Sequence, residues 1–325
     1  MTTLLIGIFL LSLLVITAVA IVRSEDLFSA VMLSGIFSLL MALNFFLLDA
    51  ADVALTEAAV GAGVATVLLL AGLKLTPPTE ARGRSLRKLS VVVIAATTLL
   101  MIYASFGQPT LGDPMAPAQQ HVAPWYIEKT PELIDIPNIV TAVLSSFRGY
   151  DTLGEVFVVL TAGIGVMFLL GGGRGKPFSR LDSHVEEGLS GHLIPKVMAR
   201  LLIPFILLFA LFVQFHGEYS PGGGFQAGAI FVAGIILYSL VRGEGLALAV
   251  IPPRVLLWMS AGGALLYGSV GLAGILMGGQ FLEYSVLSEN PVTGQHIGII
   301  VIELGVGLTV TGVLLSIFHA FAARD

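Results

Sequence analysis

Three glutamates lie inside long apolar segments, where a charged side chain is least expected. Glu57 and Glu303 stand about two turns inside such segments and Glu155 about one turn inside. A carboxylate at that depth costs roughly 3 kcal/mol, so it faces the protein interior and a partner, or it is protonated. These positions therefore indicate proton or cation handling, or else structural hydrogen bonds between helices. For Glu155 the alternative is an interfacial capping cluster with Asp151 and Arg148.

Two basic side chains share apolar segments with these carboxylates. His296 precedes Glu303 by seven residues, which places both near the same helix face, and histidine can relay protons near neutral pH. Lys74 stands at the end of the segment that contains Glu57. It either belongs to the end of a polar path or simply extends its ammonium group to the membrane surface.

The run from Phe215 to Ala229 reads FHGEYSPGGGFQAGA and joins two apolar segments. Its proline breaks the chain, and its glycines can take positive φ or let another backbone come close. A tight helical hairpin explains such a run. A binding loop explains it too, including one in which glycine amides at a helix start hold an anion. The residues that define this glycine loop are His216, Pro221, Gly222, Gly223, Gly224, Phe225 and Gln226.

Composition places the chain among helical membrane proteins. Apolar residues make up 56% and charged residues 11% of the 325 positions, and the mean hydropathy is +0.95. Soluble domains carry about 25% charged residues. The absence of cysteine excludes disulfides, thiolate zinc sites and cysteine-ligated iron–sulfur clusters in this chain. We expect no cofactor, no metal and no nucleic-acid partner, and no nucleophile–base pairing indicates an enzyme.

The long apolar runs predict an all-α fold with about nine membrane-spanning helices. We expect the first run to be a retained helix and not a cleaved signal peptide, because no Lys or Arg precedes Arg23. The expected spans are 2–22, 27–48, 51–73, 89–106, 152–171, 197–215, 223–241, 253–276 and 296–320.

Basic residues indicate the orientation, because they accumulate in cytoplasmic loops. With the N-terminus outside and the C-terminus in the cytoplasm, all 16 Lys and Arg residues except Lys129 and Arg148 fall on the cytoplasmic side. Polar linkers predict three units: a three-helix unit at 1–76, a two-helix unit with a long outer loop at 77–175, and a four-helix unit at 176–325.

The outer loop 107–151 is too long to be a simple connection. Trp125 and Tyr126 suit the membrane interface. Apolar residues at helical spacing predict a short amphipathic helix on the outer surface. These residues are Ile139, Val140, Val143, Leu144 and Phe147.

The third unit resembles a known family. The runs that carry the resemblance are FHGEYSPGGGFQAGAI and, further along the chain, NPVTGQHIGIIVIELGVGLTV. Over roughly 180–325 the chain is similar to the MrpB subunit of Mrp-type multisubunit sodium/proton antiporters. That family more often has His at the position of Glu218 and Gly at the position of Ala227.

The first two units resemble other proteins. The matching runs are DVALTEAAVGAG and PNIVTAVLSSFRGYDTLGEVFVV. They are similar to the small subunits of membrane-bound hydrogenase-type modules and to the C-terminal tail of the large MrpA subunit. In that tail the buried carboxylate often stands at the position of Gly61, whereas this chain has Glu57 one turn earlier on the same face.

The resemblance implies a subunit of a cation/proton antiporter complex in the inner membrane of a prokaryotic cell. Its partners would be other membrane subunits, including large antiporter-like ones, with the lipid bilayer, sodium ions and protons. Glu57, Glu155 and Lys74 would belong to one polar path, and Glu303 with His296 to a second cluster. The alternatives are a membrane subunit of an energy-converting hydrogenase or complex I-like respiratory complex, and a purely structural scaffold.

Overall fold

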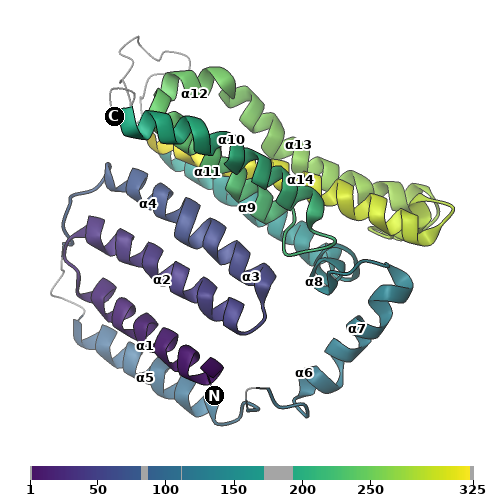
Figure 1. Cartoon of the computed structure of the whole chain (residues 1–325), viewed down its shortest axis with the longest axis horizontal. Coiled ribbons are helices and arrows are strands. Elements are labelled where there is room, and N and C mark those ends of the chain that lie inside the picture. Colours follow the sequence, from purple (N-terminus) through teal and green to yellow (C-terminus); the bar gives the residue numbers. More distant parts are fainter. Residues whose placement is uncertain (1, 82–86, 111, 172–192, 323–325) are drawn as a thin grey trace.

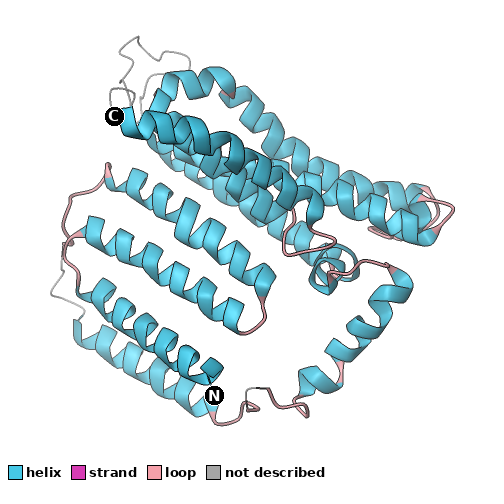
Figure 2. Ribbon diagram, in the orientation of Figure 1, coloured by secondary structure: helices cyan, strands magenta, loops and turns pink. Residues whose placement is uncertain are grey.

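The computed structural model describes residues 2–81, 87–110, 112–171 and 193–322, and these form helices joined by loops, with a single isolated bridge between Asp26 and Thr79. Within these ranges, nine helical segments are long and apolar enough to cross a bilayer (Figure 2). They are α1 (Thr2–Arg23), α2 (Leu27–Leu47), the continuous α3–η1–α4 (Ala51–Leu73), α5 (Arg87–Ser105), α9 (Gly149–Gly171), α10 (Leu193–His216), α11 (Gly224–Arg242), α13 (Pro253–Leu276) and α14 (Pro291–Ala322). The prediction of an all-α chain with nine spans is confirmed, and the linker 172–192 lies outside the described residues.

The last helix, α14, is the centre of the packing. It contacts α9, α10, α11 and α13, and half of its residues are buried. Helices α1, α2 and α3–η1–α4 pack in sequence beside this group, and η1 and α4 connect the two sets through α11 and α14 (Figure 1). Residues that the sequence places far apart therefore meet along α14 and α11.

The third span is not a uniform α-helix. Residues Glu57–Ala65 form a π-helical segment, η1, between α3 (Ala51–Thr56) and α4 (Thr66–Leu73). Such segments are rare and occur often at functional sites, because they displace one backbone carbonyl and re-aim side chains. The segment begins at Glu57, one of the carboxylates that the sequence singles out.

The long loop 107–151 contains more helix than its sequence predicts. Besides α6 (Pro117–Gln120) and α7 (Val122–Leu133), a helix runs from α8 (Ile139–Thr141) into a second π-helical segment, η2 (Ala142–Phe147). The predicted helix at 139–147 is confirmed. The face of this helix that packs into the protein differs from the apolar face that the sequence predicts. Thr141, Ala142 and Ser145 are buried, whereas Val140 and Leu144 are more than 40% exposed. Small and hydroxyl-bearing residues occupy the packed face because η2 lies against α14 and donates a hydrogen bond to it.

Two short elements complete the part of the chain that the structure describes. Helix α12 (Glu244–Val250) follows α11, and the single turn η4 (Tyr284–Leu287) packs on α14 and α13. Burial raises the pKa of the Tyr284 phenol, so the hydroxyl keeps its proton and donates to the carbonyl of Ser145 at 3.0 Å. The turn η4 thereby supports the backbone of η2.

Candidate functional site

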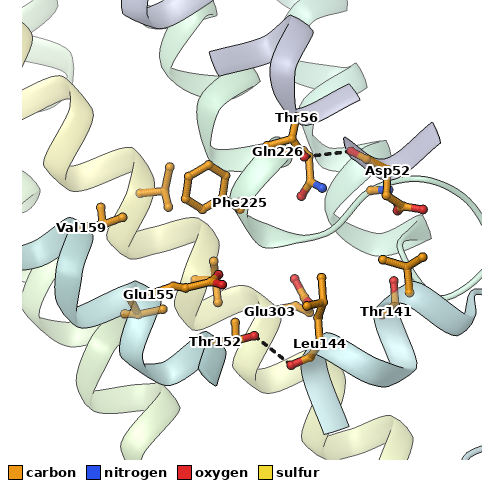
Figure 3. A pocket seen from close by; sticks show the side chains of 15 residues that line it. Asp52, Thr56, Thr141, Leu144, Thr152, Glu155, Val159, Phe225, Gln226 and Glu303 are labelled. Atoms are coloured by element: carbon orange, nitrogen blue, oxygen red, sulfur yellow. Dashed lines mark hydrogen bonds between the residues drawn. The ribbon is translucent and has the colours of Figure 1, made fainter. Parts of the chain in front are cut away.

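A cavity of about 250 Å³ lies where α3, α8–η2, α9, α11 and α14 meet (Figure 3). It is lined by carboxylates, hydroxyls and an amide among valines. Its polar lining residues are Asp52, Thr56, Thr141, Thr152, Glu155, Gln226 and Glu303. Two of the three glutamates that the sequence singles out, Glu155 and Glu303, point into this one cavity.

Glu303 is the most firmly held of these groups. One carboxyl oxygen accepts a hydrogen bond from the Ser145 hydroxyl of η2, and the other accepts one from the backbone N–H of Gly224, the first residue of α11. A carboxylate at a helix N-terminus also gains from the helix dipole. The glycine loop therefore binds a carboxyl group of the protein itself, through the Gly224 amide.

The close contact between Gly224 and α14 explains why this position is a glycine. A Cβ at Gly224 would lie 2.8 Å from the Gly307 nitrogen and 2.9 Å from Val306 Cβ. Such distances leave no room for any side chain. The preceding Gly223 has φ of +131°, a region that residues with a side chain rarely adopt. The glycine run thus allows the Gly224 amide, at the start of α11, to come within hydrogen-bond distance of Glu303.

Asp52 and Asn138 hold the other end of the glycine loop. Asp52 Oδ1 accepts from the Gly222 N–H and from Asn138 Nδ2, each at 3.2 Å. Asn138 Nδ2 also donates to the carbonyls of Gly217 at 3.1 Å and Ser220 at 3.0 Å. Its Oδ1 caps α8 by accepting from two backbone N–H groups. One asparagine thus connects α3, α8 and the glycine loop.

Glu155 lines the cavity from α9, on the same face as Thr152. The Thr152 hydroxyl donates to the Leu144 carbonyl at 2.8 Å, which fixes the start of α9 against η2. Arg148 pairs with Asp151, with Arg148 Nε 2.6 Å from Asp151 Oδ2, and both side chains are more than half exposed. The arginine is therefore engaged by the neighbouring aspartate.

Glu57 lies outside this cavity, at the start of η1, and its Oε1 is 2.6 Å from the point where a Cβ on Gly61 would stand. The Ser38 hydroxyl lies 2.7 Å from the same point. Glu57 therefore reaches one turn along the helix, into the space where a side chain at position 61 would begin. Lys74 is exposed at the far end of α4, about 25 Å along the helix from Glu57, so the structure does not bring the two together.

The two histidines of the sequence hypothesis have different surroundings. His296 Nδ1 lies 2.9 Å from Glu218 Oε2. His216 stacks between Phe212 and Tyr219, at ring-centroid distances of 4.6 and 5.6 Å. Of the other loop residues, Gly222, Phe225 and Gln226 line the cavity, whereas Pro221 is exposed.

Three residues of this site were not singled out from the sequence: Asp52, Asn138 and Ser145. Asn138 directly precedes an apolar helical pattern, which is a signal for a helix N-cap, but nothing in the sequence shows that its amide also binds the glycine loop. Ser145 lies on the polar face of the amphipathic pattern at 139–147, whereas the prediction of that helix rests on its apolar face. Asp52 lies in the first turn of a span, where an aspartate is unremarkable in sequence.

Comparison with protein families accounts for most of the chain in three consecutive matches. Residues 12–78 match the MbhD family and residues 84–179 match the MbhE family, both of which are described as subunits of MBH. Residues 194–316 match the family described as a domain related to the MnhB subunit of Na⁺/H⁺ antiporters.

Individual relatives agree with these matches. A probable K⁺/H⁺ antiporter A/B subunit of Rhizobium meliloti (strain 1021) is 28% identical over 338 aligned residues, which cover 93% of this chain and 32% of the relative. A putative antiporter subunit, mnhB2, of Staphylococcus aureus (strain Newman) is 30% identical over 128 residues, 38% of this chain and 90% of the relative. The chain thus spans about a third of the first of these proteins and most of the second.

Two solved structures are similar. The Mrp complex from Dietzia sp. DQ12-45-1b contains a chain with a TM-score of 0.79 and 28% identity, matched over 98% of this chain and 35% of that one. An archaeal membrane-bound sulfane sulfur reductase contains a chain with a TM-score of 0.56 and 28% identity, matched over 74% of this chain and 98% of that one. The chain belongs to the Mrp-type antiporter subunit family, as an MrpB-type unit joined to MbhD-type and MbhE-type units that correspond to the tail of MrpA.

Proposed function

We propose that this multi-pass membrane protein is a subunit of a multisubunit monovalent cation/proton antiporter complex, in which it forms part of the ion pathway and joins other membrane subunits. The observation that carries the proposal is the cavity at the meeting point of α3, α9, α11 and α14, with Glu155, Glu303 and Asp52 in its lining. Family membership supports the same function, since the matched relatives are named as antiporter subunits.

The chemistry of such a site is reversible occupancy of carboxylates. Neighbouring carboxylates repel one another when all are ionised, so they retain a proton or bind a cation. Sodium and potassium both prefer oxygen ligands, which the carboxylates, threonine hydroxyls and Gln226 of this cavity offer. Because a proton and a cation compete for the same oxygens, uptake of one favours release of the other. No covalent step is needed, and no cofactor takes part.

Glu57 belongs to a separate part of the proposed path, with Lys74 at its cytoplasmic end. A carboxyl group in η1 at the contact with α2 can pass ions between this chain and a neighbouring subunit. Helices α1, α2 and α5 keep many large apolar side chains exposed. We propose that large antiporter-like subunits bind the surface that these three helices form. The membrane is the prokaryotic inner membrane, with the N-terminus outside and the C-terminus in the cytoplasm. The three units divide at 1–76, 77–175 and 176–325.

Moving the carboxylate from position 57 to position 61 tests the role of Glu57. We expect Glu57→Ala to reduce exchange strongly, and the double variant Glu57→Ala/Gly61→Glu to restore most of it. The physical reason is that Glu57 Oε1 already lies 2.6 Å from the Cβ position of residue 61. Initial exchange rates in vesicles, normalised to assembled complex, provide the measurement.

Glu57→Ala/Gly63→Glu is the matched control for that experiment. Its carboxylate is on the same helix, but a Cβ at Gly63 faces the Ala58 carbonyl at 3.5 Å instead of Ser38. Equal restoration by both double variants would show that only the net charge of η1 matters and would contradict a specific path through Glu57.

The function itself is tested with the intact complex in inside-out vesicles from a host without its own sodium/proton exchange. After respiration acidifies the lumen, addition of sodium or potassium should release protons from the vesicles, as reported by a pH-sensitive dye. The smaller response identifies the less favoured cation. A purified, assembled complex that exchanges protons for none of lithium, sodium and potassium would overturn the proposal.

A redox-driven complex is the second candidate function. The observation that favours it is the match to the sulfane sulfur reductase, of which this chain covers 98% of one subunit. It predicts that iron–sulfur or hydrogenase subunits co-purify with the chain, whereas the antiporter predicts membrane subunits alone. A scaffold without an ion path is the third. It predicts that neutralising Glu57, Glu155 and Glu303 together changes assembly or nothing, without a specific transport defect.

A further inference from the structure

Glu218 and His296 form a partly buried pair between the glycine loop and α14. Glu218 belongs to the glycine loop and His296 to the first turns of α14, and Glu218 Oε2 lies 2.9 Å from His296 Nδ1. The Glu218 side chain is only 11% exposed, whereas that of His296 is 29% exposed. The histidine is therefore the more accessible member, and the carboxyl group is the inner one.

The second oxygen of this carboxyl group, Glu218 Oε1, is buried and has no hydrogen-bond partner among the described residues. Leaving a charged oxygen buried without a partner costs more than the roughly 1–3 kcal/mol of a neutral group. A protein retains such a group where a proton, a water molecule or an ion satisfies it for part of a cycle. The loop that carries Glu218 also carries Gly224, whose backbone N–H donates to the Glu303 carboxyl group, so the loop connects the two acidic residues.

We propose that His296 and Glu218 form a proton relay that connects the outer face of the membrane with Glu303. This inference rests on the proposed antiporter function and on the proposed orientation, which places the start of α14 outside. It assigns a role to Glu218 and makes the histidine the entry point.

The transfer is a sequence of proton hops without any electron transfer. A proton from the outer water binds His296 Nε2 while the proton on Nδ1 moves to Glu218 Oε2, so one N–H bond forms as another breaks. The neutral Glu218 carboxyl group then delivers a proton through a bridging water to Glu303. Once Glu303 is neutral, its repulsion of Glu218 ends. The imidazole returns to the Nδ1–H tautomer by losing its Nε2 proton to water and gaining one on Nδ1 from water, and the pair then loads again. The reverse order releases protons to the outside.

The charged groups near the relay are few in the described part of the chain. On α14 they are His296 and Glu303 themselves. On the glycine loop, His216 lies two residues before Glu218 and stacks between Phe212 and Tyr219. From α3, Asp52 reaches the glycine loop through the Gly222 amide. From the junction of η2 and α9, Glu155 faces the cavity and Arg148 is paired with Asp151. The relay is therefore surrounded mainly by carboxyl groups, an environment that favours proton uptake.

The test uses the assembled complex in proteoliposomes, with exchange rates measured as a function of the pH on the side that carries the relay. We expect His296→Gln and Glu218→Gln each to slow exchange at least about tenfold. That loss is below the roughly 10²-fold that a positioned proton-transfer group typically contributes, because water can partly replace the relay. Both variants should also lose the change in rate across the neutral pH range that a histidine confers.

The exchanged pair Glu218→His/His296→Glu keeps one imidazole and one carboxyl group in contact. We expect it to recover the pH profile, which a purely structural role would not explain. His121→Gln, an exposed histidine in the outer loop, is the control for the loss of a histidine and should keep the parent profile.

The outcomes separate this inference from the function on which it rests. A parent complex without exchange contradicts the proposed function. If the parent complex exchanges and both single variants keep its rate and pH profile, the relay alone is overturned.

Infrared difference spectra between acidic and neutral pH provide a readout that does not depend on exchange. A carboxyl band that disappears in Glu218→Gln supports the relay, and its absence from the parent complex overturns it. If a single variant assembles poorly, the spectrum of the parent complex still tests the relay, because it needs no variant.

Discussion

Replacing Glu303 by glutamine is expected to lower exchange at least about 10²-fold while the complex still assembles. The substitution removes the group that takes up a proton or cation but keeps its shape. Its oxygen can accept from the Gly224 N–H, and its NH₂ group can donate to the Ser145 hydroxyl, which is able to rotate and accept. Both contacts of the parent carboxyl group thus have a counterpart in the variant. The measurement is the initial rate of exchange in vesicles, with assembly checked by native gel electrophoresis.

Glu289→Gln is the matched control. It removes the same charge from an exposed position just before α14, so any effect of net charge on membrane insertion is shared. Exchange should stay near the parent rate in this control. If Glu303→Gln exchanges as fast as the control, the carboxyl group in the cavity is a structural hydrogen-bond acceptor, and the scaffold hypothesis gains.

The sequence predicts the membrane spans well because a single physical requirement determines them. A bilayer demands about 20 apolar residues per helix, and the spans expected from the apolar runs agree with the observed helices to within a few residues. The depth of Glu57, Glu155 and Glu303 follows from the same reasoning. That Glu155 and Glu303 share a cavity does not, because it depends on how α9 packs against α14, which no local pattern encodes.

The parts of the site that the sequence does not reveal are those made by backbone geometry. A π-helical segment differs from an α-helix in that its hydrogen bonds span five residues instead of four, and its residues carry no distinct pattern. Both η1 and η2 were therefore unexpected, although one begins at Glu57 and the other carries Ser145 to Glu303. In the same way, the sequence alone allows several interpretations of the glycine loop. In the structure, its backbone amides donate hydrogen bonds to Glu303 and Asp52.

Gly224→Ala is expected to prevent α11 from seating on α14. The added Cβ would stand 2.8 Å from the Gly307 nitrogen and 2.9 Å from Val306 Cβ. Overpacking of a core typically costs about 1–3 kcal/mol when side chains can move. Here two of the three nearest atoms, the Glu303 carbonyl oxygen and the Gly307 nitrogen, belong to the backbone. We therefore expect the cost to lie above about 3 kcal/mol. The variant complex should melt at a lower temperature or fail to assemble, which thermal denaturation of the purified complex measures.

Gly262→Ala on α13 is the control for that experiment, because a Cβ there meets no atom within 4 Å. The added methyl group should leave assembly and exchange close to the parent values.

The possible outcomes for Gly224→Ala have different meanings for the mechanism. If Gly224→Ala assembles normally but loses exchange, the Gly224 amide acts on Glu303 and the packing is tolerant. If it assembles and exchanges normally, the contact between α11 and α14 is wider than the structure shows, and the loop does not position Glu303. The expected joint loss of assembly and exchange would mean that the same glycine secures the packing of α11 on α14 and the hydrogen bond to the carboxyl group. In that case the bond could not be removed from the protein without also separating the two helices.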